Sequence, residues 1–233
     1  MHALITNAGS AKRLEGKVYV ITFFVSETEW ALDKKMGLFK QMRDAESWLE
    51  KTAMQYGKTV RFVNGVYGLF EPFSTSIISD YNSGESHTDI AIKYLLQAGC
   101  PLENYPEWVK KNSGCDQSLV FIVANKHGRG YACPICIPGS NLPEGAILFH
   151  STTDPLIAGN IIHEMLHLFG AEDLYAVTPE MADINAKAEK MFPKEVMHNS
   201  YVPLHELMIS PLTAWLVGLS DKKEPWFDDF LLS

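Results

Sequence analysis

An eleven-residue pattern, His163-Glu164-x-x-His167-x-x-Gly170-x-x-Asp173, most constrains what this chain can fold into. At 3.6 residues per turn, two histidines four positions apart project from one face of a helix, about 40° apart. Only glycine takes a left-handed, helix-ending conformation without steric cost, so Gly170 can end the helix and turn the chain back. The pattern therefore predicts a helix and a sharp turn that brings Asp173 towards the two imidazoles.

The chemistry of these side chains indicates a metal site. Two imidazoles and a carboxylate suit zinc, and three protein ligands leave a fourth position open, as catalytic zinc sites do. Glu164 follows the first histidine directly, so it points beside the metal, where it can take a proton from a metal-activated water and pass it to a leaving amine. Chance would produce the extended pattern in roughly one shuffled chain in ten thousand. We therefore interpret His163, His167 and Asp173 as zinc ligands and Glu164 as the general base.

The same residues resemble the zinc-binding consensus of the metzincin metallopeptidases, which are zinc endopeptidases with a methionine turn beneath the metal. Most of that clan has a third histidine where this chain has Asp173, and an aspartate there is similar to the smaller snapalysin-like and immune-inhibitor-like groups. Residues 196–201 (Val-Met-His-Asn-Ser-Tyr) resemble the methionine turn. The resemblance implies that Met197 forms a hydrophobic floor under the metal without binding it. It also makes Tyr201 a candidate for stabilising the oxyanion, although Tyr201 stands four positions after Met197, where the family pattern has two.

The resemblance further implies an α+β fold. A metzincin-like chain has a twisted mixed β-sheet with an antiparallel edge strand, which pairs with the substrate backbone above the cleft. It has two main helices, the second carrying the histidines, and a small, mostly helical C-terminal lobe. Residues 130–138 or 146–150 are the candidates for the edge strand. A length of 233 residues fits a single catalytic domain, with subdomains at about 15–173 and about 174–233.

Apolar periodicity and turn residues predict strands and helices along the chain. The clearest strand is the uninterrupted apolar run at residues 118–124. Asp154 and Pro155 are expected to begin the histidine-bearing helix, as its cap and first residue. Further strands are expected at 17–25, 59–62, 131–137 and 146–150, further helices at 42–55, 88–97, 178–191 and 211–217, and a loop at 71–85.

Charge and hydropathy narrow the class of partner. A net charge of −8 and a pI near 5.5 argue against nucleic acid, because phosphate binding needs a basic face. We see neither a signal peptide nor a membrane-spanning run of apolar residues, so no membrane partner is expected. The expectation is a cytoplasmic protein acting on peptide or protein substrates. A toxin or effector exported by a leaderless route would have the same appearance.

Four cysteines occur, at Cys100, Cys115, Cys133 and Cys136. The last two form a C-x-x-C pair, which invites a redox or second-zinc interpretation. They lie in a strand-like run and no second C-x-x-C exists, so a structural thiol pair is favoured. Cys100 and Cys115 could form a disulfide in an oxidising compartment.

The third ligand and the function both have alternatives. His198 or His205 could contact substrate, or could bind the metal in place of Asp173. In a gluzincin-type peptidase the third ligand would be a glutamate on a later helix, but Gly170, Asp173 and Met197 speak against this. A non-catalytic, zinc-stabilised peptide-binding protein is a further alternative, although the general base is present in the sequence. The candidate gluzincin ligands are Glu180, Glu189 and Glu195.

Overall fold

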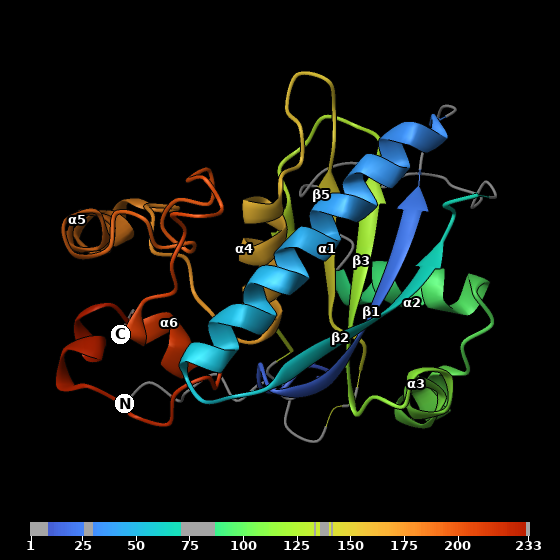
Figure 1. The fold of residues 1–233 in the computed structure, drawn as a ribbon, viewed down its shortest axis with the longest axis horizontal. Helices are drawn as coiled ribbons and strands as arrows, with labels where there is room; N and C mark the ends of the chain where they lie inside the picture. Colours follow the sequence, from blue (N-terminus) through green and yellow to red (C-terminus); the bar gives the residue numbers. More distant parts are fainter. Residues whose placement is uncertain are drawn as a thin grey trace.

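The computed structural model describes residues 9–25, 30–70, 87–132, 134–135, 140 and 142–231. In these residues the chain has an α+β fold with a five-stranded mixed sheet of order β2-β1-β3-β5-β4 (Figure 1). The α+β expectation is thus confirmed. The strands are β1 (Gly16–Val25), β2 (Val60–Tyr67), β3 (Gln117–Ala124), β4 (Tyr131–Ala132) and β5 (Gly145–Phe149), and the helices are α1 (Leu32–Gln55), α2 (His87–Gln97), α3 (Tyr105–Ser113), α4 (Ala158–Leu168), α5 (Ala182–Met191) and α6 (Pro211–Leu216).

Four strands of the sheet are parallel and the fifth is an antiparallel edge. β1 pairs in parallel with β2 and β3, β3 pairs in parallel with β5, and β4 runs antiparallel to β5. Of the two candidate edges, residues 130–138 contain the edge strand, although residues 133 and 136–138 lie outside the described chain. The alternative at 146–150 is wrong, because β5 lies between β3 and β4.

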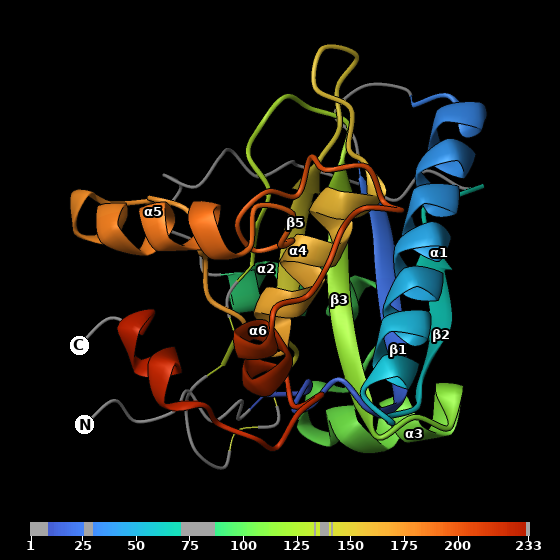
Figure 2. The same cartoon turned by 60° about the vertical axis from the view of Figure 1, so that its left-hand side comes forward.

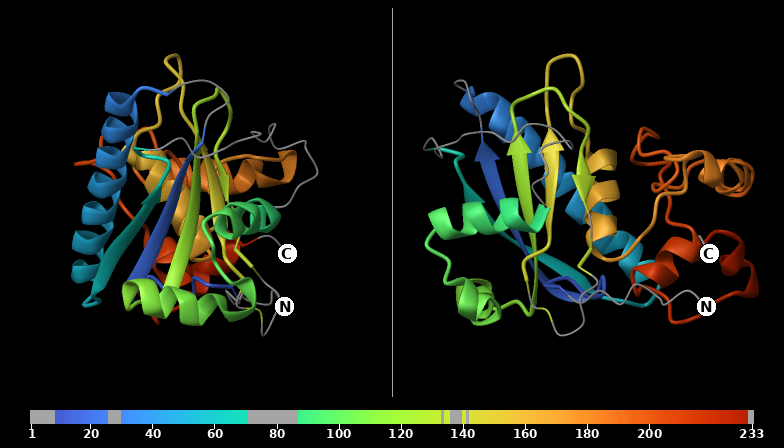
Figure 3. Two further views of the ribbon diagram at one scale, coloured as in Figure 1. Left: turned by 90° about the vertical axis from the view of Figure 1, so that its right-hand side faces the viewer. Right: turned by 180° about the vertical axis from the view of Figure 1, so that it is seen from behind.

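Helices cover both faces of the sheet (Figure 3). Successive residues of a strand point to opposite faces, and β3 shows this directly. Leu119, Phe121 and Val123 enter the core under α1 and α4, whereas Val120 and Ile122 enter the core under α2 and α3. The central strands are therefore buried on both faces, which explains why the apolar run at 118–124 is uninterrupted.

The C-terminal residues pack beside α4 rather than against the sheet (Figure 2). They are mostly helices and turns: α5, α6 and the 3₁₀ segments Pro179–Met181 and Pro225–Asp229. Val196, Leu212 and Phe227 are fully buried and belong to the same core cluster as the apolar residues of α4. Ser210 caps α6, since its Oγ accepts the Thr213 N–H at 3.1 Å.

Helix boundaries are where the sequence predictions fail. α4 begins at Ala158, not at Pro155, because Asp154 takes part in a preceding turn in which its N–H donates to Ser151 Oγ at 3.0 Å. The first N–H of α4, at Ala158, is instead satisfied by the Gln41 side chain at 3.0 Å. α1 begins ten residues earlier than the expected 42. Most of residues 32–41 are exposed, so this part of the helix buries few side chains that could mark it in the sequence.

Two other expectations concern cysteines and membranes. Cys100 and Cys115 are buried free thiols, so they do not form a disulfide here. Cys133 and Cys136, and the predicted loop at 71–85, lie outside the described residues. None of the helices in the described part of the chain combines the length and apolarity that crossing a bilayer requires.

Candidate metal centre

Helix α4 and the turn after it position the three predicted ligands. Its apolar residues Ile161, Ile162, Met165 and Leu166 are fully buried, which fixes the rotation of the helix about its axis. Gly170 follows with a φ of 97°, in the left-handed region where only glycine is unstrained. The chain reverses there, as predicted, and the N–H of Ala171 returns to the carbonyl of Leu166 at 3.0 Å.

The ligand atoms of His163, His167 and Asp173 converge. The two Nε2 atoms lie 3.1 Å apart, and Asp173 Oδ1 lies 3.2 Å from His163 Nε2 and 3.1 Å from His167 Nε2. Within the described residues, these three side chains form the group of ligand atoms that could hold a metal ion. The structure thus brings together the three residues that the sequence pattern selects.

Backbone carbonyls fix the tautomer of both imidazoles. His163 Nδ1 lies 3.1 Å from the Val196 carbonyl oxygen, and His167 Nδ1 lies 2.8 Å from that of Ala171. A carbonyl only accepts hydrogen bonds, so both Nδ1 atoms carry a proton, and each Nε2 of a neutral ring presents a lone pair. Three acceptor atoms then lie within 3.2 Å of one another. Such an arrangement requires positive charge among them.

The pKa shifts of His167 and Asp173 also indicate positive charge in this cluster. Burial lowers the pKa of His167, but the hydrogen bond and charge of Asp173 outweigh it, and the net shift is upward. Burial likewise raises the pKa of Asp173, but both imidazoles hold that pKa well below its usual range. A proton can supply this positive charge, and so can a divalent cation, whose histidine ligands must be neutral. Two imidazoles and one carboxylate fit zinc.

Glu164 is a buried carboxylate with an unsatisfied oxygen. Its side chain is 8% exposed, and Oε2 has no hydrogen-bond partner within the described chain. Burial raises the pKa of Glu164, opposed by the two imidazoles. A Cβ atom at Gly130 would lie 3.0 Å from Glu164 Oε1, so glycine at 130 leaves the carboxylate its space. An unpaired buried carboxylate oxygen is costly, and its usual partner is water or substrate.

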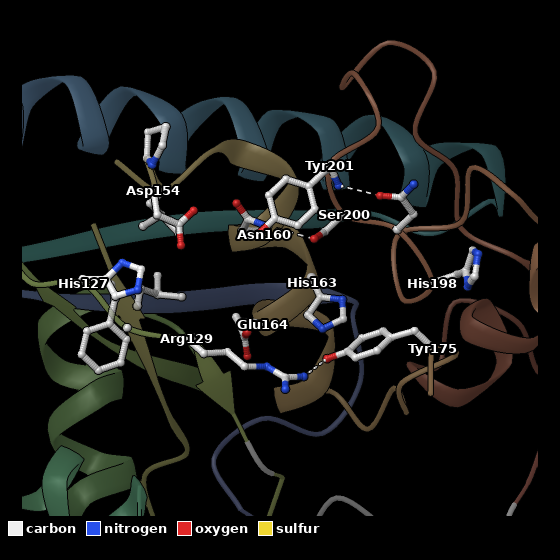
Figure 4. Close-up of a pocket in the computed structure, with 17 residues that line it drawn as sticks. His127, Arg129, Asp154, Asn160, His163, Glu164, Tyr175, His198, Ser200 and Tyr201 are labelled. Carbon is white, nitrogen blue, oxygen red and sulfur yellow. Dashed lines mark hydrogen bonds between the residues drawn. The ribbon is translucent and has the colours of Figure 1, made fainter. Parts of the chain in front are cut away.

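A cleft opens in front of His163 and Glu164, with a cavity volume of about 460 Å³ (Figure 4). Its walls come from residues 127–130 before β4, from residues 154–160 at the start of α4, and from residues 198–201. The general base predicted from sequence and the first histidine therefore face solvent-accessible space.

The predicted methionine turn lies directly against the ligands. Met197 is fully buried, and its carbonyl accepts the Leu174 N–H at 3.0 Å, one residue after Asp173. Glu195 is also fully buried and organises this turn, since its carboxylate accepts the backbone N–H groups of Met197 and His198 and, at 2.7 Å, the hydroxyl of Thr213. Burial raises the pKa of Glu195 to about 7, against these hydrogen bonds.

The alternative ligands do not join the cluster. Glu195 serves the turn, Glu180 and Glu189 are exposed, and none of the three belongs to the metal-binding group of the described residues. His198 lines the cleft with its Nδ1 3.2 Å from the Leu174 carbonyl oxygen. The His205 side chain is 81% exposed and lies 3.6 Å from Glu206.

Tyr201 lines the cleft but is 68% exposed, and of its atoms only the backbone N–H is in a hydrogen bond within the described structure, to Asn199 Oδ1 at 3.1 Å. No hydrogen bond among the described residues orients the Tyr201 hydroxyl, and its oxyanion role stays a prediction from the resemblance.

Two cleft residues were missed from the sequence. Arg129 Nη2 donates a hydrogen bond to Tyr175 Oη at 2.5 Å, and the Tyr175 ring lies 5.9 Å from the His163 ring, centroid to centroid. Burial and the charge of Asp173 raise the pKa of Tyr175 to about 12, so the phenol stays protonated. Its position two residues after Asp173 could have identified Tyr175. Nothing in the turn at 125–130 singles out Arg129.

Comparison of the sequence with known protein families and with curated proteins finds no match for this chain.

Proposed function

We propose that this chain is a zinc-dependent endopeptidase of metzincin type, with His163, His167 and Asp173 as ligands and Glu164 as the general base. The observation that carries the proposal is the pairing of two unusual features beside one cleft, whose lining includes His163 and Glu164. Three acceptor atoms converge within 3.2 Å, and a buried carboxylate beside them has an oxygen with no hydrogen-bond partner among the described residues. The first feature calls for a cation and the second for a proton donor, such as water.

The zinc ion, when bound, would polarise a peptide carbonyl and increase the acidity of a water molecule. Glu164 accepts the proton of the attacking water and later delivers it to the nitrogen of the leaving amine. Its unpartnered Oε2 is the atom suited to this role. His163 and His167 are oriented by the carbonyls of Val196 and Ala171, so they need little rearrangement to bind an ion.

The substrate is proposed to be an extended peptide segment. β4 pairs antiparallel with β5 and is the last strand in the sheet order of the described residues, the position at which a peptide can add to a sheet. Gly130 precedes β4 directly and stands next to Glu164, which brings that edge to the general base. We expect cleavage within a chain rather than at its end, because an extended segment could lie across the cleft with residues on both sides of the cleaved bond.

The test uses Glu164→Gln as the decisive variant and a peptide library derived from a whole proteome as substrate. Wild-type protein should cleave the library with zinc and stop with a chelator. Glu164→Gln should keep one zinc per chain and lose about 10²–10⁴-fold in rate, because acid–base catalysis contributes that much. Unchanged hydrolysis in this variant would exclude the assigned base.

Asp173→Asn is the matched variant for the ligand set. The amide has nearly the same shape as the carboxylate but lacks its charge, so zinc affinity should fall by at least about tenfold while the fold is retained. Metal content after dialysis against a zinc buffer measures this. Equal zinc content in the variant and the wild type would remove Asp173 from the ligand set.

A further inference from the structure

Tyr175 and Arg129 form a pair on the wall of the cleft beside His163 and Glu164 (Figure 4). Tyr175 follows the turn that carries Asp173, and Arg129 comes from the segment before β4, so the pair joins the two sides of the site. The guanidinium carbon lies 5.6 Å from the centre of the Tyr175 ring, and one of its nitrogens donates to Oη at 2.5 Å.

The direction of this hydrogen bond leaves one donor available. A guanidinium only donates, so the phenol oxygen is the acceptor and its own proton must point elsewhere. No acceptor for that proton is found among the described residues around Tyr175. The pair therefore presents an oriented O–H, backed by a positive charge, to a cleft whose wall includes His163 and Glu164.

Resting on the proposed function, we propose that Tyr175 is a further catalytic residue: its hydroxyl donates a hydrogen bond to the oxyanion formed from the peptide carbonyl, and Arg129 is the residue that positions it. In this proposal Tyr175 takes the role in place of Tyr201. The oriented donor acts where charge develops, and donors of this kind are among the strongest contributors to acyl-transfer catalysis.

The bonds and protons of the step balance. The water oxygen bonds to the carbonyl carbon, the carbonyl π pair moves to its oxygen, and one water proton goes to Glu164. The Tyr175 hydroxyl stabilises that oxygen while it is negative and keeps its own proton throughout. When the electron pair on that oxygen re-forms the carbonyl π bond, the carbon–nitrogen bond breaks and the proton passes from Glu164 to the nitrogen. One peptide bond and one water molecule give a carboxyl group and an amine.

Tyr201 is the matched control, because it lines the same cleft but its hydroxyl is not held by a neighbouring side chain among the described residues. It is 68% exposed and its hydroxyl has no partner within the described chain, whereas the Tyr175 hydroxyl is held by Arg129. A phenylalanine at either position removes one hydroxyl and leaves the ring. The two variants thus differ only in which oxygen is lost.

The first experiment compares Tyr175→Phe with Tyr201→Phe, using the peptide that the wild type cleaves best. Tyr175→Phe should lower kcat about 10²–10³-fold, the effect of removing one oxyanion donor. Its KM and its zinc content should stay within about twofold, because the interaction exists only in the transition state. Tyr201→Phe should keep kcat within about twofold. A loss of kcat in Tyr201→Phe with Tyr175→Phe unaffected would overturn the assignment.

The second readout is binding and requires no turnover. A phosphinic version of the same peptide carries a tetrahedral anionic centre, so Tyr175→Phe should weaken its binding by about the factor lost in kcat. Calorimetry on the zinc-loaded proteins measures this, with Tyr201→Phe unchanged. Equal affinity of Tyr175→Phe and wild type for the phosphinic peptide would overturn the proposal.

A double-mutant cycle tests the part assigned to Arg129. If Arg129 acts through Tyr175, Arg129→Ala should lower kcat in the wild-type background and change it by less than about twofold in Tyr175→Phe. Additive losses would mean that Arg129 acts on the substrate by itself, against the proposal.

Two outcomes distinguish a wrong Tyr175 assignment from a wrong proposed function. A wild-type protein that binds zinc and cleaves nothing contradicts both. A wild type that cleaves peptides, with Tyr175→Phe equally fast, contradicts the Tyr175 assignment alone.

Discussion

The two faces of the sheet differ in where they hold ionisable groups. Among the described residues, the buried side chains under α2 and α3 are neutral, and their polar contacts include a hydrogen bond of 2.7 Å between Tyr105 and Ser118. The side of the molecule that carries α1, α4 and the C-terminal residues holds the converging imidazoles and the buried carboxylates of Glu46, Glu164 and Glu195. The packing under α2 and α3 therefore contributes to stability whether or not a metal or an extra proton is bound. The other side carries groups whose burial is compensated only when hydrogen bonds, protons or a cation are present.

The comparison predicts its largest effect for two leucines that cover opposite faces. Leu166 on α4 and Leu95 on α2 are both fully buried, and replacing either with alanine should cost about 2–5 kcal/mol of unfolding free energy. Only Leu166→Ala should also weaken zinc binding, by about tenfold, because it loosens the helix that orients the ligands. Urea unfolding and zinc titration measure the two effects. An equal loss of zinc affinity in Leu95→Ala would show that the faces are not independent.

Removal of the metal sharpens the same contrast. Zinc at about 100 times its dissociation constant should raise the unfolding free energy by about 2.7 kcal/mol, and a chelator should reverse this. Hydrogen exchange should then increase in α4 and in residues 195–198, with α2 and α3 unaffected below the threshold of global unfolding. Faster exchange in all helices alike would contradict a local role of the metal.

The smallest effect concerns a buried carboxylate away from the metal centre. Burial raises the pKa of Glu144 to about 8, although its oxygens accept the N–H groups of Ala11 and Ile135. The folded state then holds a proton more tightly than the unfolded state. Stability is greatest below the unfolded pKa of 4.5 and is lost as pH rises to about 8.

We expect the unfolding free energy to fall as pH rises through this window, by less than about 1.4 kcal/mol per pH unit. Glu144→Gln should lack this dependence, so the stability advantage of the wild type over the variant should shrink as pH rises. Parallel stability curves for the two proteins between pH 4.5 and 8 would contradict the assignment.

Much of the ligand arrangement was predictable because it is local. Eleven residues, from His163 to Asp173, contain the C-terminal part of α4, the left-handed glycine and the three predicted ligands. The central strands were predictable for a similar reason, since burial on both faces leaves an apolar run. The antiparallel edge was expected from the family resemblance, and only its location among two candidates remained open.

What the sequence did not reveal depends on contacts between distant segments. Arg129 reaches Tyr175 across 46 positions of the chain, and Gln41 satisfies the first N–H of α4 across 117. No local pattern marks such partners. Glu195 could be read as a ligand because it is a carboxylate after the motif, and only its burial beneath the turn identifies it as the acceptor for Met197 and His198.

The hydrogen bonds that orient His163 and His167 end on main-chain oxygens, at Val196 and Ala171. Every amino acid carries that oxygen, so substitutions at 196 or 171 cannot delete the acceptor in the way that replacing an aspartate would. The backbone conformation, rather than any side chain, thus determines which ring nitrogen of each histidine carries the proton. Sequence drift around the centre can alter its shape, yet it leaves the choice of donor nitrogen intact.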